Sequence, residues 1–431
     1  MAFGGYTMWK INDNYTNNEE EVKKHFGLKY LPMTKSLLDT DTYKISMDQV
    51  YYHQFDDITA TWDFKARNVG ENCDHEKFTD KDIEEITKQI KAYCALRFSR
   101  DELDWLNIRM KWIHKDYTNF LSFWHPRFEN FTILNDSPSG LKITFDGVQA
   151  YVTFYEIPVL EIVAETYYRN HYDYDKLFEV FKDETNKKIA KIKNGEYKLG
   201  TWSEFGARRR LSYEAQDWLI KTIIENKVPG FIGTSNMDLA RKYGINPCGT
   251  MAHEFIMTVG QGIPQNNPAY SNKFALDAWV KEYGILNGIA LTDTIGTDVF
   301  LKDFQLTFAT LFGGVRHDSG DPKVWGDKMI THYKSLGIDP MTKTLLFSDS
   351  LNGEKATELV EYFEGRAKIA FGIGTWWSAP QSVKPLNIVS KTALVNGRDV
   401  AKLSDAPGKS MCRNPEYVEY LQRCVSWRLN H

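Results

Sequence analysis

The chain has 431 residues and a net charge of −4, with 42% hydrophobic and 26% charged residues. This length suffices for two domains or one large barrel with an extension, and the composition excludes a disordered chain and argues against a general nucleic-acid binder. No apolar run approaches the roughly 18 residues of a membrane span, and no secretory signal pattern is present, so we expect no membrane association. The five cysteines are odd in number and form no CxxC pair, which predicts free thiols and a cytoplasmic location, with a nuclear pool left open.

The first 150 residues combine helical and strand patterns and therefore predict an α+β arrangement. Residues 1–30 are polar and acidic, which is typical of an arm or an extra helix. A helix N-cap is expected near Asp39 or Thr40, and turn-forming pairs between residues 135 and 147, the last of them Asp-Gly, predict hairpin turns. The expected elements are a helix over 37–55, a strand over 58–67, helices within 79–109 and short strands over 133–152.

Residues 158–186 are expected to be mostly helical, and after them short apolar strands alternate with helices. Each of these strands runs into a cluster of glycine, hydroxyl or charged residues. In a β/α barrel all parallel strands end on the face that holds the active site. An open doubly wound sheet would also bind ligands there, but seven contributing strands favour a closed or nearly closed barrel. The expected strands lie at 197–202, 231–232, 245–248, 285–291, 310–315, 345–347 and 369–371.

The stretch 231–254 (FIGTSNMDLARKYGINPCGTMAHE) contains two of these strand ends. Its second strand runs through a glycine and Thr250 into His253 and Glu254, where backbone N–H groups and a helix start can hold an anion. Histidine can act as an acid, a base or a nucleophile that carries a phosphoryl group, whereas Glu254 should point elsewhere. His253 is therefore a candidate catalytic residue. A structural histidine is the alternative, and His317 in RHDSGD is a rival.

The run 203–210 (SEFGARRR) places Phe205 between a carboxylate and three arginines. An aromatic face beside guanidinium groups suits a flat anionic ring, through stacking and through paired hydrogen bonds to a carboxylate or phosphate. The turn 372–375 (GIGT) offers backbone N–H groups to a phosphate. Carboxylates at strand ends can bind ribose hydroxyls or a hydrated Mg²⁺ ion, and they are Asp293, Asp318, Asp321 and Asp349.

These clusters leave several interpretations open. Each one could be an ordinary helix cap or tight turn, but caps do not require an arginine run, a His–Glu pair or an RHDSGD loop. The tryptophans and strand-end carboxylates also suit a barrel glycosidase, although a neutral sugar needs no anion site. A non-enzymatic nucleotide-binding protein is the third alternative. Turnover of an anionic ring with a phosphorylated ribose donor, of a glycoside, or of neither would separate these functions.

Nine motifs follow one another between about residue 36 and residue 411, in the order LLDTDTYKISM, EFGARRR, FIGTSNMDLARKYG, GTMAHE, ALTDTIGTD, VRHDSGDP, FSDSLN, FGIGT and VNGRDVAKLSDAPGK. Together they resemble the nicotinate phosphoribosyltransferase family, and GTMAHE with RHDSGD is far more specific than any single glycine loop. The resemblance implies an α/β fold with an irregular β/α barrel, expected over 156–389. It also implies an additional α+β domain built from both chain ends, expected over 1–155 with about 390–431.

The resemblance further implies an enzyme of NAD biosynthesis or salvage. It would form nicotinate mononucleotide and pyrophosphate from nicotinate and phosphoribosyl pyrophosphate, with coupled ATP hydrolysis through a phosphohistidine at His253, and with Mg²⁺ present. The implied substrate site has Tyr43 and Phe205 on the two faces of the pyridine ring. The resemblance also implies that Asp318 is a catalytic residue and that Thr250 belongs to the substrate site. Arg208 and Arg316 would contact the acid or the donor phosphates, and Asp293, Asp318 and Asp349 would contact the ribose and the metal. Gly372 and Gly374 would surround the 5′-phosphate.

Nicotinamide is the nearest alternative substrate. An uncharged amide would favour an acidic partner near the ring, whereas the 208–210 arginine run and the GTMAHE stretch favour the acid. Family members often place the segment around Tyr43 across a dimer interface, so a homodimer is open for this chain. The sequence does not indicate the metal ligands, the ATP-binding residues or the regulation.

Overall fold

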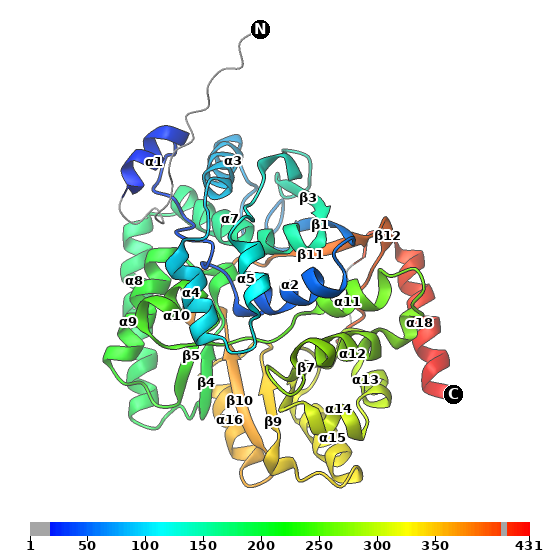
Figure 1. Ribbon diagram of the computed structural model, residues 1–431. Coiled ribbons are helices and arrows are strands. Elements are labelled where there is room, and N and C mark those ends of the chain that lie inside the picture. The colour runs from blue at the N-terminus through cyan, green and yellow to red at the C-terminus, as the bar shows by residue number, and fades with distance from the viewer. Residues whose placement is uncertain (1–17, 407–411) are drawn as a thin grey trace.

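The computed structural model describes residues 18–406 and 412–431 (Figure 1). An antiparallel sheet contains β1 (Thr59–Ala66), β2 (Phe131–Leu134), β3 (Lys142–Val148), β11 (Ile388–Val395) and β12 (Arg398–Asp399). Its order is β12-β11-β1-β3-β2. Because β11 pairs with β1 along its length, the sheet joins the two ends of the chain. The strand expected over 58–67 is confirmed, but the expected Asp-Gly turn at 146–147 lies inside β3, and residues 149–152 are helical.

The N-terminal helices follow the predicted pattern, with shifted ends. The N-cap of helix α2 is Asp41, one to two residues later than expected. The Asp39 carboxylate does not cap it, because Asp39 accepts hydrogen bonds from Arg210 at 2.6 and 2.9 Å instead. Of the expected acidic arm, residues 1–17 lie outside the described ranges. The helices are α1 (Glu19–Phe26), α2 (Thr42–Gln54), α3 (Asp80–Cys94), α4 (Arg100–Arg109), α5 (Lys115–Leu121), α6 (Gln149–Val152), α7 (Glu156–His171) and α8 (Tyr174–Lys193).

The second sheet has seven strands, all parallel, in the order β6-β5-β4-β10-β9-β8-β7. It confirms the predicted barrel class and the seven predicted strands, although β4, β7 and β8 begin about four residues later than expected. The delay before β8 has a simple cause, because residues 306–311 form a helix. The strands are β4 (Thr201–Glu204), β5 (Phe231–Thr234), β6 (Asn246–Pro247), β7 (Ile289–Leu291), β8 (Gly314–His317), β9 (Thr344–Phe347) and β10 (Lys368–Ile373).

The barrel is irregular because its edge strands β6 and β7 are not paired with each other in the described part of the chain. The chain that leaves β6 bridges this gap, since the Thr250 hydroxyl donates to the Ile289 carbonyl at 2.9 Å. In Figure 1 the parallel strands β4, β10 and β9 lie in the lower half, and the antiparallel sheet lies above them. The carboxyl ends of the parallel strands therefore face the antiparallel sheet.

Helices alternate with the parallel strands, as the pattern predicts. Several begin at side-chain caps, among them Ser212, Asn236, Asp321 and Asn352, which fits the preference of such residues for helix starts. These helices are α9 (Tyr213–Glu225), α10 (Met237–Tyr243), α11 (His253–Gln261), α12 (Ser271–Tyr283), α13 (Thr297–Asp303), α14 (Leu306–Leu311), α15 (Pro322–Ser335), α16 (Gly353–Phe363) and α17 (Thr375–Ser378). A last helix, α18 (Pro415–Asn430), follows the antiparallel strands.

One large hydrophobic core extends from the antiparallel sheet through α7 to the parallel strands. The division into domains at residues 155 and 389 therefore stays a prediction. All five cysteines are unpaired, as expected. Across the described ranges, no helix has both the length and the apolar character that crossing a bilayer requires.

Candidate active site

A cavity of about 290 Å³ lies at the carboxyl ends of the parallel strands. The turn after β4 supplies Phe205, Arg208 and Arg209 to its wall, and the start of α11 supplies His253. Loops after β9 and β10 supply residues 348–351 and 374–375, and the opposite wall comes from β1, α7 and β11. The cavity is thus built between the two sheets, as an active site at the ends of parallel strands would be.

His253 is the first residue of α11 and forms contacts through both ring nitrogens. Its Nδ1 lies 2.9 Å from the Thr294 hydroxyl. Its Nε2 lies 2.8 Å from Asp318 Oδ2 and 2.8 Å from the Lys402 ammonium. One tautomer can donate from Nε2 to the carboxylate, and the other can accept from the ammonium. Burial, reinforced by the Lys402 charge, lowers the pKa of His253 to about 4, so the imidazole is neutral at physiological pH.

Two aspartates and a lysine surround this imidazole. Lys402 lies 3.0 Å from Asp293 Oδ2 and 3.4 Å from Asp318, and the Ser319 hydroxyl donates to the same Asp293 oxygen. Against the effect of burial, the His253 hydrogen bond and the Lys402 ammonium hold the pKa of Asp318 well below its usual range. The pKa of Asp293 is likewise lowered, against burial, by His253 and Lys402. Both carboxyls are therefore ionised, which does not suit the raised-pKa acid of a glycosidase.

Sequence reasoning missed Lys402. The residue lies in the VNGRDVAKLSDAPGK stretch, which contributed to the resemblance without a role for any single residue. Lys402 is buried, with 4% of its surface exposed. Lys391 on β11 was also missed, and burial, with Lys402 and Arg67 nearby, lowers its pKa to about 7. For Lys391, a charged residue in a strand-forming segment was the available signal.

The three arginines of the 208–210 run have three different environments. Arg208 lies 3.4 Å from Asp41 and 3.6 Å from Glu156. The Arg209 Nε donates to the Ile388 carbonyl at 3.0 Å. Arg210 is fully buried against Asp39, so it is part of the core, while the other two line the cavity.

The Tyr43 ring lies under the Arg208 guanidinium, at 5.6 Å. Its hydroxyl donates to Glu156 at 3.4 Å, and the residue is 5% exposed. Phe205 lines the cavity, whereas Tyr43 is not among the described residues of its wall. The predicted arrangement of both rings around one pyridine stays a prediction, and it requires Arg208 or Tyr43 to move when a ring binds.

The remaining predicted residues are distributed around the same strand ends. Arg316 donates to the Met251 carbonyl at 2.8 Å, while its buried Nε has no partner among the described residues. Asp349 lines the cavity. His317, the rival histidine, is packed against Trp325 and Phe347. Since it is 2% exposed, its environment is that of a core histidine.

Gly372 and Gly374 have different surroundings. Gly372 lies inside β10, and a Cβ atom there would be 2.4 Å from the Phe205 ring. Gly374 follows the strand and lines the cavity. A side chain at position 372 would collide with the Phe205 ring, which explains why this residue is glycine. Of the two glycines, only Gly374 lines the cavity, where the predicted phosphate could contact it.

We expect Gly372→Ala to raise the KM of the pyridine substrate that the resemblance implies, because the added methyl group would displace the Phe205 ring. Phe205→Ala should raise the same KM by about 10- to 100-fold, equivalent to roughly 1–3 kcal/mol for a lost aromatic contact. In steady-state kinetics the double variant should be no worse than Phe205→Ala alone, since both changes act through one ring. Additive losses would show that Gly372 contacts the ligand independently.

The comparisons with known proteins identify the family of the chain. Residues 38–164 match the model of the nicotinate phosphoribosyltransferase N-terminal domain, and residues 201–426 match the model of the nicotinate phosphoribosyltransferase family. The chain belongs to the nicotinate phosphoribosyltransferase family. The two matched regions include every residue that the resemblance assigned to the site.

Curated relatives and solved structures cover nearly the whole chain. The nicotinate phosphoribosyltransferase of Cupriavidus necator is 40% identical over 91% of this chain and 98% of its own length. That of Pseudomonas savastanoi is 42% identical over 90% and 94%. The crystal structure of the Vibrio cholerae enzyme has a TM-score of 0.83 at 33% identity, covering 91% and 94% of the two chains. That of the Porphyromonas gingivalis enzyme has a TM-score of 0.81 at 32% identity, covering 91% and 99%.

Proposed function

We propose that this protein is a nicotinate phosphoribosyltransferase of NAD biosynthesis or salvage. It transfers the phosphoribosyl group of phosphoribosyl pyrophosphate to nicotinate and releases nicotinate mononucleotide and pyrophosphate. The observation that carries this proposal is the position of His253, with two ionised aspartates and a lysine, beside a cavity lined by Phe205 and arginines. That cavity suits a flat anion, and the histidine cluster suits a phosphoryl group.

The transfer itself needs orientation and charge neutralisation more than proton movement. The lone pair of the pyridine nitrogen forms the new bond to the ribose C1 carbon. The bond from that carbon to the pyrophosphate oxygen breaks, and its electron pair leaves with pyrophosphate. Phe205 offers a face for the pyridine ring, and the guanidinium groups in the cavity wall, Arg208 and Arg209, favour the anionic donor and leaving group.

We infer that ATP acts through phosphorylation of His253. The neutral imidazole, with its pKa near 4, keeps a lone pair on one ring nitrogen, and this nitrogen can take the γ-phosphoryl group as ADP leaves. The start of α11 and the Lys402 ammonium favour the new negative charge. A phosphoryl group here would displace Lys402 or Asp318 from the ring nitrogen and so couple ATP to the donor site.

The residues around His253 also fit a Mg²⁺ ion. Asp293 and Asp318 offer carboxylate oxygens, and the buried Oδ1 of Asp293 has no hydrogen-bond partner among the described residues. Mg²⁺ binds such oxygens and keeps several waters. When bound, the ion would neutralise pyrophosphate charge. The proposal of a Mg²⁺ site rests on this donor set alone.

We expect the acid to be favoured over the amide because two arginines, Arg208 and Arg209, line the cavity wall. An assay with purified enzyme, phosphoribosyl pyrophosphate, Mg²⁺ and ATP should release pyrophosphate and ADP with nicotinate, and far less with nicotinamide. Equal turnover of both would support the nicotinamide alternative. No turnover of either, with retained ATP binding, would support a non-enzymatic nucleotide-binding protein.

Arg316→Met should weaken nicotinate or donor binding by about 1.5–3 kcal/mol, the value of a charge-assisted bond in a dry site. The reason is the unpartnered Nε of this buried guanidinium. Substrate KM values and ATP binding should be measured together with a melting curve. Arg366→Met is the matched control, because Arg366 pairs with Asp327 at the surface. Equal losses for all ligands would indicate misfolding and contradict the assigned role.

We further propose a cytoplasmic protein, and the homodimer stays a prediction. Tyr43 is packed against Arg208 and Glu156 of its own chain. Tyr43 thus lies beside Arg208 of the cavity wall without a second copy. A nuclear pool has no support in the fold.

A further inference from the structure

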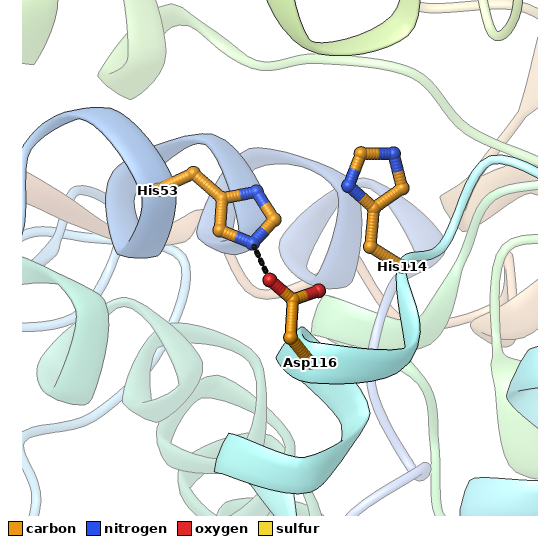
Figure 2. Close-up of side chains that lie close together, drawn as sticks. All are labelled: His53, His114 and Asp116. Atoms are coloured by element: carbon orange, nitrogen blue, oxygen red, sulfur yellow. Dashed lines mark hydrogen bonds and ion pairs between the residues drawn. The ribbon is translucent and has the colours of Figure 1, made fainter.

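A second cluster of metal-binding side chains lies outside the cavity (Figure 2). His53 is near the C-terminal end of α2, His114 is the residue before α5, and Asp116 is in the first turn of α5. One donor atom from each lies within 4.8 Å of the others. Figure 2 shows the three side chains converging from these elements on one space.

A buried carboxylate orients one of the two histidines. His53 Nδ1 lies 2.6 Å from Glu282 Oε1, and the Glu282 side chain is 5% exposed. The amides of Gln49 and Gln54 donate to the two Glu282 oxygens at 2.8 and 3.2 Å. Glu282 on α12 is therefore held in place, and it fixes His53 so that Nε2 faces Asp116. A histidine that donates from one nitrogen to a carboxylate and binds metal through the other is a common arrangement at metal sites.

The cluster has two carboxylates and no permanently charged cation. Among the described residues, Asp116 and Glu282 form ion pairs only with histidines, namely His53 and His114. Two carboxylates thus face two imidazoles, with no lysine or arginine in an ion pair with either. A divalent cation bound to neutral imidazoles would balance both carboxylates without protonation of the rings.

The spacing fits a metal with nitrogen and oxygen ligands. His53 Nε2 and Asp116 Oδ2 are 3.2 Å apart, and two ligands of a tetrahedral zinc at about 2.0 Å each are separated by roughly 3.3 Å. The His114 and Asp116 side chains are 50% and 68% exposed, so both can rotate onto an ion. Three protein ligands leave the fourth position to water.

We propose that His53, His114 and Asp116 bind one divalent transition-metal ion of the zinc class, with Glu282 as the carboxylate that orients His53. Two imidazoles and one carboxylate suit Zn²⁺ better than Mg²⁺ or Ca²⁺. The ion would join the C-terminal end of α2 to α5. The opposite end of α2 carries Tyr43 under Arg208, so the site would stabilise the helix that supports the cavity.

The test uses the full chain without a histidine tag, stripped of metal by a chelator. Zn²⁺ is titrated in competition with a chromophoric chelator, and Co²⁺ is added separately so that its absorption reports nitrogen ligands. We expect one ion per chain in the wild type. His114→Ala should weaken binding at least tenfold and Glu282→Gln by about 10- to 100-fold. Zn²⁺ should raise the melting temperature of the wild type and leave that of His114→Ala unchanged.

Two controls keep the result specific. His253→Asn removes the other cluster of possible ligands, His253 with Asp293 and Asp318, and it should still bind one Zn²⁺ ion. His431→Ala removes an exposed imidazole at the C-terminus and should also bind normally. Circular dichroism of each metal-free variant checks folding. Equal Zn²⁺ affinity in wild type and His114→Ala, or loss of binding in His253→Asn, would overturn the proposal. His53 would then only be a hydrogen-bonded bridge between Asp116 and Glu282.

Discussion

His253→Asn is expected to carry no phosphoryl label after incubation with γ-labelled ATP, whereas the wild type should carry an acid-labile, base-stable label on His253. The variant should also lose the stimulation by ATP. If the His253 imidazole is the nucleophile of the coupled step, we expect the ATP-stimulated rate to fall by about a hundredfold or more. Slow ATP-independent formation of nicotinate mononucleotide should remain. The physical reason is that Phe205 and the arginines of the cavity do not depend on the imidazole.

The matched control for this experiment is His317→Asn. His317 ends β8 but is packed against Trp325 and Phe347, so this variant should keep the label if it folds. Peptide mapping of the labelled protein identifies the modified histidine directly. A label on His317, or full ATP stimulation in His253→Asn, would remove His253 from the mechanism.

Lys402→Met is expected to lower the free energy of unfolding by about 3–5 kcal/mol, the usual cost of leaving a buried charge without its partner. The charge concerned is Asp293, whose side chain is fully buried and lies 3.0 Å from Lys402. Urea unfolding at neutral pH measures the loss. Lys402→Met with Asp293→Asn should recover part of it, because the double variant removes both charges, and an unrecovered loss would contradict the pairing.

The same substitution should move the pH dependence in a defined direction. Burial and Lys402 hold the pKa of His253 at about 4, below its ordinary 6.5, so in the wild type the imidazole stays neutral as the pH falls from 6.5 toward 4. Without Lys402 the pKa of His253 rises, because the repelling cation is gone while Asp293 and Asp318 remain. The rate of label formation should therefore decline at a higher pH in Lys402→Met. An unchanged profile would show that burial alone sets the pKa.

Local sequence patterns were a good guide to the strand ends. Phe205, His253 and Asp349 were singled out from their positions after short apolar strands, and all three line the cavity. The arginine run was less informative. Its three residues look alike in sequence, but the tight turn at 207–209 sends Arg208 and Arg209 to the cavity wall and Arg210 into the core.

The sequence by itself determined the class of fold and the end of the barrel that carries the site. It could do so because strand and helix periods are local, and because the carboxyl ends of parallel strands meet on one face whatever the loops contain. Only the tertiary structure placed Lys402 against His253, 149 positions earlier in the chain, and His53 against Asp116 and Glu282. Such contacts depend on how β11 pairs with β1 and how α2 packs on α12, and no local pattern records a pairing between distant segments.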